Sequence, residues 1–533
     1  MDMDHRAKRV AIVGAGTSGL AACKHLLARG FRPVVFEAGK SVGGLWTRTL
    51  ASTRLQSHAA TYRYSDFPWP DSAGAYPRHD QVVDYLAAYA RRFGVDGCVR
   101  FRSRVVAAEY VGDEPEDAPD RWERWAGNGE AFGDSTGAWR LTVRCRGESE
   151  TEPETQEVHE FDFLILCIGM FSGVPNIPSA FPGPEAFRGP VLHSMELSDM
   201  AHADAAALVT GKRVAVVGSS KSAFEIANDC AEANGAGTPC TVVCRNPQWT
   251  MHRPAVWGGV SIGYLYMNRF AELMVPRPGA GAASRVLAAL LAPLAWAISA
   301  ATGAWYRREI PMREYGMEPG HGFARCVSSC LLSVLPDGFY DRVREGSVVF
   351  ARSRSFGFRH DGLVLDGAEE RVVPADVVIF ATGFRGDKKL RDMFASTRVK
   401  DFIGESAPLY RECVHPRIPQ MAVVGYAGGL NSIYACEMEA KWVARLLDGV
   451  FRLPSVRQME ESCAEWGRYY ARRSGGGGEG QSPGPCLGAV NVWYNDELCR
   501  DMGCNPRRKK MKGQGLLAEW FLPYSIVDYA DIQ

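Results

Sequence analysis

The chain has 533 residues, which exceeds one ordinary domain and predicts at least two domains with a large buried core. It carries 61 basic and 61 acidic residues, so its net charge gives no reason to expect nucleic acid or an anionic membrane as the main partner. Fifteen cysteines without framework spacing, and a polar start in place of an apolar signal segment, favour a reducing cytoplasmic compartment.

The first element is a short apolar run over residues 9–13, followed by glycines at the GxGxxG spacing and a helix-like continuation. Gly14 permits the tight turn, Gly16 lets the backbone approach a pyrophosphate, and Gly19 lets the helix pack closely on the strand. The helix directs its N-terminal amides at the phosphate. The next apolar run ends in Glu37, about 20 residues on, where an acid binds ribose hydroxyls. This pattern predicts a dinucleotide site.

A second pair of glycines follows the acid and indicates which dinucleotide binds there. Gly43 and Gly44 let the backbone approach a bulky ligand again, which a flavin needs and NAD does not. With this segment the sequence resembles the flavin-containing monooxygenases, and the resemblance covers nearly the whole chain. It implies FAD as cofactor, held by Gly14, Gly16, Gly19, Glu37, Gly44, Leu45 and Trp46.

The segment between the two nucleotide loops carries a pattern similar to the family fingerprint FxGxxxHxxx(Y/F). It runs from Phe187 through His193 to Leu197, and Leu197 stands where an aromatic residue is usual. The resemblance implies that His193 belongs to an interdomain hinge.

A second strand, loop and helix pattern begins at Arg213, with Ser220 and Ala223 in place of the second and third glycines. The following strand ends in Arg245, whose guanidinium accepts a 2′-phosphate that an acid would repel, so NADPH is favoured over NADH. Lys221 either adds charge to the same pocket or is a solvated surface lysine. The NADPH-binding residues expected here are Gly218, Ser219, Ser220, Lys221, Ser222 and Arg245.

An uncharged stretch, rich in Ala and Leu, runs from Val286 to Trp305 and includes Pro293. Its length suffices to span a bilayer. Small residues dilute its hydrophobicity and the proline interrupts it, so a buried helical insertion is favoured over attachment to a membrane surface and over a true span.

The run from Val377 to Phe384 resembles the "ATG" strand of two-dinucleotide flavoproteins and is expected to return the chain to the first domain, with Thr382 and Gly383 beside both cofactors. The fold class expected is therefore α/β, with a discontinuous FAD-binding Rossmann-like domain over 1–195 and 335–533 and an inserted NADPH-binding Rossmann-like domain over 196–334. The basic run 507–510 is expected to be a solvated loop. Cys326 and Cys330 are expected to be core thiols, and no metal site is expected.

The resemblance implies that NADPH reduces FAD, and that reduced FAD reacts with O2 to form a C4a-hydroperoxide, which oxygenates a soft nitrogen or sulfur nucleophile. Gln56 aligns with a family asparagine, so its amide is the candidate catalytic group. Segments around Gln56, Tyr64 to Pro70 and Leu446 to Gly449 resemble the plant branch that includes pipecolate N-hydroxylases of defence signalling. The alternatives are an S-oxygenating or indole-pyruvate-type monooxygenase and a catalytically decayed FAD-binding protein. The expected location is the cytoplasm or the surface of the endoplasmic reticulum, and the oligomeric state is left open.

Overall fold

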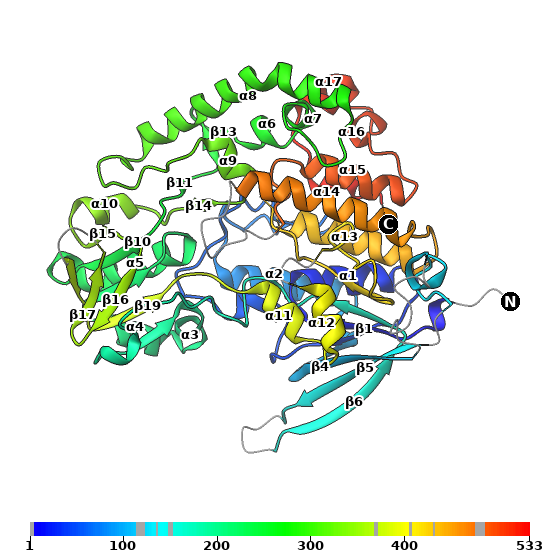
Figure 1. The fold of residues 1–533 in the computed structure, drawn as a ribbon, viewed down its shortest axis with the longest axis horizontal. Coiled ribbons are helices and arrows are strands. Elements are labelled where there is room, and N and C mark those ends of the chain that lie inside the picture. The colour runs from blue at the N-terminus through cyan, green and yellow to red at the C-terminus, as the bar shows by residue number, and fades with distance from the viewer. Residues whose placement is uncertain are drawn as a thin grey trace.

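The computed structural model describes residues 5–112, 123–134, 137–147, 153–366, 371–404, 408–429, 432–474 and 485–532. Its first unit is built on a parallel sheet (Figure 1). The strands stand in the order β20, β7, β1, β2 and β3, with bounds Met421–Val423, Phe163–Leu166, Val10–Val13, Val34–Phe36 and Val99–Arg100. Every residue of β1, β7 and β20 is buried, which explains why these strands read as continuous apolar runs.

The two faces of this sheet are covered by different layers. Val10 and Ile12 belong to a core shared with helices, whereas Ala11 and Val13 belong to a core shared with an antiparallel sheet, because successive side chains of a strand point to opposite faces. The helices are α1 (Thr17–Leu27), α2 (His79–Arg92) and α13 (Ser432–Leu447). The antiparallel sheet is β4 (Ser103–Val111), β5 (Ala138–Cys145) and β6 (Thr155–Phe161).

The second unit repeats the same layering. Its parallel sheet has the order β15, β10, β9, β19 and β8, with bounds Val348–Arg352, Cys240–Cys244, Val214–Val217, Val377–Phe380 and Val191–His193. One face packs on α3 (Ser194–Asp199), α4 (His202–Val209), α5 (Lys221–Asn234) and α10 (Phe339–Arg344). The other face packs on a three-stranded antiparallel sheet of β16 (Phe356–Arg359), β17 (Gly362–Leu365) and β18 (Arg371–Pro374).

The domain boundary expected at residue 335 is too early. Strands β15 and β19 pair with β10 and β9, so the chain stays in the second unit through Phe380 and only β20 rejoins the first sheet. The "ATG" strand therefore does not return the chain to the first domain. A buried apolar run fits a central position in either parallel sheet, so the pattern by itself did not distinguish them.

Two antiparallel linkers connect the units where the chain leaves and re-enters the first one. The amide of Asn176 donates to the carbonyl of Gly383 at 2.9 Å, and that of Arg385 donates to the carbonyl of Val174 at 2.8 Å. His193 ends β8, and its ring meets Phe384 of the second linker edge to face at 5.2 Å. Helices α11 (Gly386–Asp392) and α12 (Thr397–Ile403) follow the second linker.

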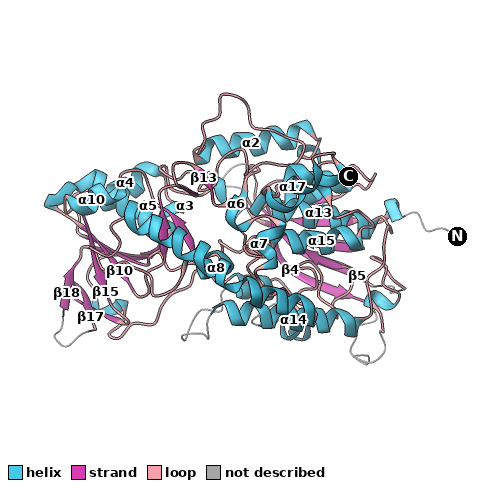
Figure 2. Cartoon of the chain, turned by 90° about the horizontal axis from the view of Figure 1, so that it is seen from above, coloured by secondary structure: helices cyan, strands magenta, loops and turns pink. Residues whose placement is uncertain are grey.

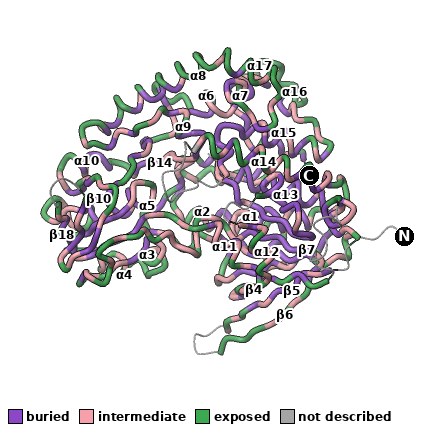
Figure 3. The backbone as a smooth tube through the Cα atoms, viewed as in Figure 1, coloured by how far each residue is buried: buried purple, intermediate pink, exposed green. Residues whose placement is uncertain are grey.

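An insertion follows β10, and its long helix lies along the upper edge in Figure 1. It contains β11 (Trp249–Met251), β12 (Ala255–Val256), β13 (Val260–Ser261), α6 (Gly263–Tyr266), α7 (Arg269–Leu273), α8 (Ala282–Glu309), α9 (Phe323–Ser328) and β14 (Leu332–Val334). The segment 286–305 forms a helix as expected, within α8. The expectation that this helix is buried is wrong, because α8 is largely exposed (Figure 3). Among the described residues, α8 is the one helix long and apolar enough to cross a membrane.

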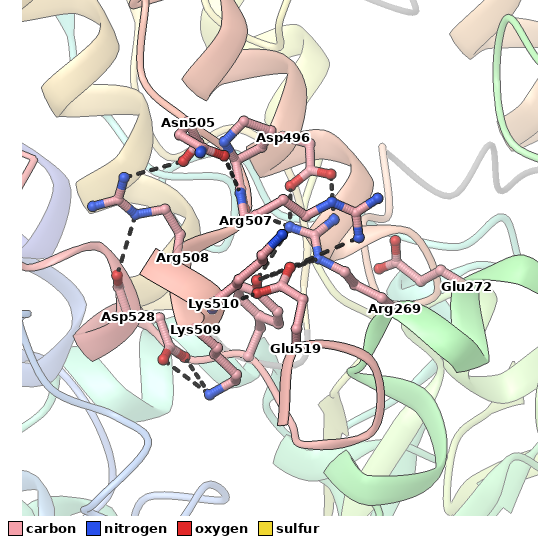
Figure 4. Close-up of polar contacts among 12 residues, drawn as sticks. Arg269, Glu272, Asp496, Asn505, Arg507, Arg508, Lys509, Lys510, Glu519 and Asp528 are labelled. Carbon is pink, nitrogen blue, oxygen red and sulfur yellow. Dashed lines mark hydrogen bonds and ion pairs between the residues drawn. The ribbon is translucent and has the colours of Figure 1, made fainter. Parts of the chain in front are cut away.

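The C-terminal helices α14 (Val456–Ser474), α15 (Asn491–Asp501), α16 (Arg508–Met511) and α17 (Gly515–Phe521) anchor this insertion. Buried Arg269 of α7 pairs with Asp496 and with Glu519, both at 2.5 Å (Figure 4). Because an isolated buried charge is very costly, these ions are expected to hold the two segments together as a unit.

Two further expectations fail in this region. The basic run is not a solvated loop, because Arg508 and Lys509 are buried and Lys509 pairs with Asp528 at 2.9 Å. Cys330 is not a free core thiol but forms a disulfide with Cys486, 156 residues further on. Both features depend on partners far along the chain, which local pattern does not reveal.

Candidate functional site

The first glycine loop joins β1 to α1 as the sequence predicts. A Cβ on Gly14, whose φ is +103°, would lie 2.6 Å from the carbonyl oxygen of Cys167, and one on Gly19 would lie 1.9 Å from that of Gly14. Both positions therefore exclude any larger residue. The loop leaves the first amides of α1 free of side-chain caps, as an anion site at a helix N-terminus requires.

The second glycine pair lies against this loop. A Cβ on Gly44 would come within 3.0 Å of the Cα of Gly16, and the amide of Gly43 donates to the carbonyl of Ala15 at 3.0 Å. Leu45 is exposed, and the indole N–H of Trp46 donates to the hydroxyl of Tyr62 at 3.1 Å. The backbone cradle formed here fits the pyrophosphate of a dinucleotide.

Glu37 ends β2 beside this cradle and is buried. Its Oε2 accepts the amide of Ala15 and its Oε1 accepts the amide of Gly39, both at 2.7 Å. A carboxylate has further lone pairs, so it can accept from ribose hydroxyls while it orders the loop. The structure thus assigns the acid a second task, the fixing of the phosphate loop, that the spacing did not indicate.

The second nucleotide loop reproduces the first. A Cβ on Gly218, at φ +144°, would lie 2.3 Å from the carbonyl oxygen of Ala381, which follows β19 as Cys167 follows β7. The hydroxyl of Ser220 meets that of Ser333 at 3.0 Å, and that of Ser219 donates to the carbonyl of Asn246 at 3.3 Å. The serines that replace glycine therefore have protein partners for their side chains.

The two cations expected at the 2′-phosphate differ in their surroundings. Arg245 follows β10 directly, is exposed, and lies beside the loop, because the amide of Gly218 donates to the carbonyl of Val243 at 2.9 Å. The Nζ of Lys221 donates to the carbonyl of Arg54 at 3.2 Å and lies 5.7 Å from the ring centroid of Trp46. Lys221 thus connects α5 to the loop that contains Gln56, and its role toward the 2′-phosphate stays a prediction. Ser222, half-buried, follows it in the first turn of α5.

The loop that contains Gln56 packs against α5 of the second unit. The hydroxyl of Thr53 donates to Glu225 at 3.1 Å, and that of Ser52 donates to Asp229 at 2.7 Å. Burial raises the pKa of Glu225 and raises that of Asp229 to about 6. These contacts were missed from the sequence, because the spacing of two acids on a helix does not tell which loop they meet.

Gln56 itself has a buried side-chain nitrogen, Nε2, with no hydrogen-bond partner among the described residues. A buried amide without a partner is costly, so this atom is available to a bound ligand. Its loop contacts α5 of the second unit, and the catalytic role of its amide stays a prediction.

Thr382 and Gly383 lie in the second linker. The hydroxyl of Thr382 donates to the carbonyl of Asn176, and the side-chain Nδ2 of Asn176 donates back to the carbonyl of Thr382 at 3.2 Å. A Cβ on Gly383 would have nothing within 4 Å, so space is open at this point between the units. The Thr382 hydroxyl has a structural partner, whereas the Gly383 backbone faces room for a ligand.

The residues present thus fit two dinucleotides. The first cradle would hold FAD and the second NADPH, and the two coenzymes would supply hydride transfer and oxygen activation when bound. The protein groups position both coenzymes and offer one uncommitted amide. No cluster of three or more metal-ligating side chains occurs among the described residues.

Comparisons with known proteins agree with this geometry. The pattern described as Flavin-binding monooxygenase-like matches residues 7–475. The chain is 33% identical to the Probable flavin-containing monooxygenase 1 of Arabidopsis thaliana, with 98% of this chain and 96% of that protein covered. Flavin-containing monooxygenase 1 of Canis lupus familiaris is 26% identical, with coverage of 94% and 84%.

Solved structures show the same fold. A steroid monooxygenase with bound NADP superposes with a TM-score of 0.62 at 19% identity, covering 93% of this chain and 98% of that one. The S-allyl-L-cysteine S-oxygenase of Allium sativum gives a TM-score of 0.56 at 18% identity, covering 96% and 95%. The chain therefore belongs to the flavin-binding monooxygenase-like family and is an FAD-containing, NADPH-dependent monooxygenase.

Proposed function

We propose that this monooxygenase oxygenates the nitrogen of a small amine, and that a cyclic amino acid such as pipecolate is its substrate. The observation that carries the proposal is the buried amide nitrogen of Gln56, which has no partner among the described residues and lies in the loop that contacts α5 through Ser52 and Thr53. The segments around Gln56 and Leu446 to Gly449 that resemble the pipecolate-hydroxylating plant branch support the choice of substrate.

The protein's part in this chemistry is to position the two coenzymes and to exclude water from the site. The glycine cradles fix both coenzymes, and the contacts of Ser52 and Thr53 with α5 hold the Gln56 loop against the second unit. The amide N–H of Gln56 is proposed to donate to bound coenzyme or oxygen and so limit wasteful release of hydrogen peroxide. A site that admits water loses oxidising equivalents in this way.

S-oxygenation is the second candidate, supported by the similarity in fold to the S-allyl-L-cysteine S-oxygenase of Allium sativum. Pipecolate and S-allyl-L-cysteine are both small amino acids, but they present different nucleophilic atoms. Mass spectrometry after incubation with each compound, NADPH and O2 separates the candidates. A gain of one oxygen atom by pipecolate supports N-hydroxylation; a gain only by the sulfur compound assigns the alternative.

The role of Gln56 is tested by the ratio of hydrogen peroxide released to NADPH consumed. Gln56→Leu removes the amide at similar volume and is expected to raise this ratio, whereas Gln56→Asn keeps the amide and is expected to restore coupling in part. An unchanged ratio in Gln56→Leu removes the residue from the mechanism. A colourless protein that does not bind added FAD would point to a decayed enzyme.

We further propose that the enzyme acts in the cytoplasm or at the surface of the endoplasmic reticulum; thirteen free cysteines among the described residues support this location, and the Cys330–Cys486 disulfide counts against it. Fractionation of the tissue that expresses it, with activity measured in each fraction, tests this location.

A further inference from the structure

The loop formed by residues 48–54 belongs to the first unit in sequence but packs on the second unit. It joins Trp46, in the first glycine cradle, to Gln56. Leu50 is 8% exposed and lies in the apolar core of the second unit, whereas Leu55, further along the chain, lies in the core of the first. The two units lie side by side, with α4 and α5 in one and α13 and β5 in the other (Figure 2). Loop 48–54 therefore reaches across to the second unit and returns.

One face of α5 receives this loop. Lys221, Glu225 and Asp229 recur at a spacing of four residues, so they lie on the same side of the helix. Their partners follow one another along the loop in the opposite order, so the loop runs antiparallel to α5. The contacts are those of Lys221 with the carbonyl of Arg54 at 3.2 Å, Glu225 with the hydroxyl of Thr53 at 3.1 Å, and Asp229 with the hydroxyl of Ser52 at 2.7 Å.

The same helix begins at the second nucleotide loop. Ser220 precedes its first residue, and no side chain among the described residues caps the first amides of α5. These amides are therefore free for the phosphates of NADPH. Because α5 is one rigid element, a ligand that fixes its N-terminus also restricts the face that holds loop 48–54.

Two further contacts hold the start of the loop. The guanidinium of Arg48 lies 3.6 Å from the carboxylate of Asp199 in α3, and the Nε2 of His202 in α4 lies 3.3 Å from the carbonyl oxygen of Thr49. Polar groups of α3, α4 and α5 thus position the loop, together with its buried leucine. In contrast, the amide nitrogen of Gln56 just beyond the loop has no partner among the described residues. This arrangement suits a segment that is positioned by the second unit and ends in a group free to meet a ligand.

We propose that loop 48–54 couples the binding of NADP(H) at α5 to the position of Gln56. Leu50, Ser52 and Asp229 are the positioning residues of this coupling, and they act through the loop and not by touching a coenzyme. With the second cradle occupied, α5 and the loop bound to it are held in one position; with the cradle empty, the loop is freer to separate from α5. Such coupling is reciprocal, so the loop contacts also favour the binding of NADP(H). The inference rests on the proposed function only for the role of Gln56.

Hydrogen–deuterium exchange of the full-length, FAD-loaded enzyme, with and without NADP+, tests the coupling. In the wild type we expect NADP+ to slow exchange of the backbone amides in peptides that cover 218–225 and 48–57. The double variant Ser52→Ala/Thr53→Val removes both hydroxyls with little change in volume. It is expected to keep the protection of 218–225 and to lose at least about fivefold of the protection over 48–57, which is the factor that one lost hydrogen bond gives.

Matched variants separate this effect from a general loss of stability. Thr155→Val/Ser462→Ala changes the same residue types on β6 and α14, and is expected to behave like the wild type. Asp229→Asn keeps an acceptor for the hydroxyl of Ser52 and is expected to keep the protection of 48–57 by NADP+, whereas Asp229→Ala is expected to lose it. Flavin absorbance of each preparation reports whether the FAD site is intact.

Three results would overturn the proposal. The first is a wild-type enzyme in which NADP+ leaves exchange over 48–57 unchanged, and the second is equal protection in Ser52→Ala/Thr53→Val and its control. The third is loss of protection over 218–225 as well in that variant, because the two hydroxyls would then only support the fold. If the coupling persists but Gln56→Leu leaves the ratio of hydrogen peroxide to NADPH unchanged, the catalytic role of Gln56 fails and the coupling stands.

Discussion

Replacing Arg245 with alanine is expected to weaken the binding of NADPH much more than the binding of NADH. The residue follows β10 directly, its backbone neighbours the Gly218 loop, and its side chain is exposed. A hydrogen bond to a charged group contributes about 1.5–3 kcal/mol, and exposed ion pairs contribute about 1 kcal/mol or less. The free energy that an exposed guanidinium contributes by binding a phosphate should lie between these two values.

We therefore expect Arg245→Ala to cost about 1–2 kcal/mol of NADPH binding, which corresponds to about a 5- to 30-fold higher KM. A second cation limits the loss, since Arg352 is the register partner of Cys244 on the neighbouring strand and is also exposed. NADH lacks the 2′-phosphate, so its KM should be nearly unchanged.

The assay is NADPH or NADH oxidation over a range of coenzyme concentrations, followed by absorbance. Arg457→Ala in α14 is the control, because that arginine is 87% exposed and lies outside the second unit. Arg245→Lys keeps a positive charge and should fall between the wild type and Arg245→Ala. Equal changes in the two KM values, or no change in either, would refute the assignment of Arg245 to the 2′-phosphate.

Two further predictions concern stability. Gly19→Ala places a Cβ 1.9 Å from the carbonyl oxygen of Gly14, so it should lower the free energy of unfolding by about 1–3 kcal/mol and weaken FAD retention. Gly467→Ala is the control and should do neither, because a Cβ there would have nothing within 4 Å. Melting curves and flavin absorbance compare the two variants. Burial raises the pKa of Glu272 to about 8 although its oxygens accept the amides of Val492 and Trp493. The folded state then keeps a proton that the unfolded state releases, so stability should fall as pH rises from 4.5 toward 8 and level off above it. Glu272→Gln should flatten this part of the stability profile, and a profile as steep as that of the wild type would contradict the assignment.

The agreement between pattern and structure is closest at the two nucleotide loops. The glycines at positions 14, 19 and 218 sit where neighbouring carbonyls exclude a Cβ. Such constraints act within one strand, turn and helix, so spacing along the chain is enough to recognise them.

The failures have one physical origin. Partners distant in the chain decided that Val377–Phe380 joined the second sheet and that α8 stayed largely exposed. Apolar content alone predicts a helix or a strand; it does not predict which surface covers it.

The sequence by itself determined the family and the two coenzymes, and it located the two glycine loops, because glycine spacing and the residue ending each strand express local chemistry. Only the tertiary structure decided where the second domain ends, that Ser52 and Thr53 meet α5, and that the leucines of α8 face outward. Those outcomes depend on which surfaces meet when the chain folds, and contacts between remote segments leave no period or spacing in the sequence to read.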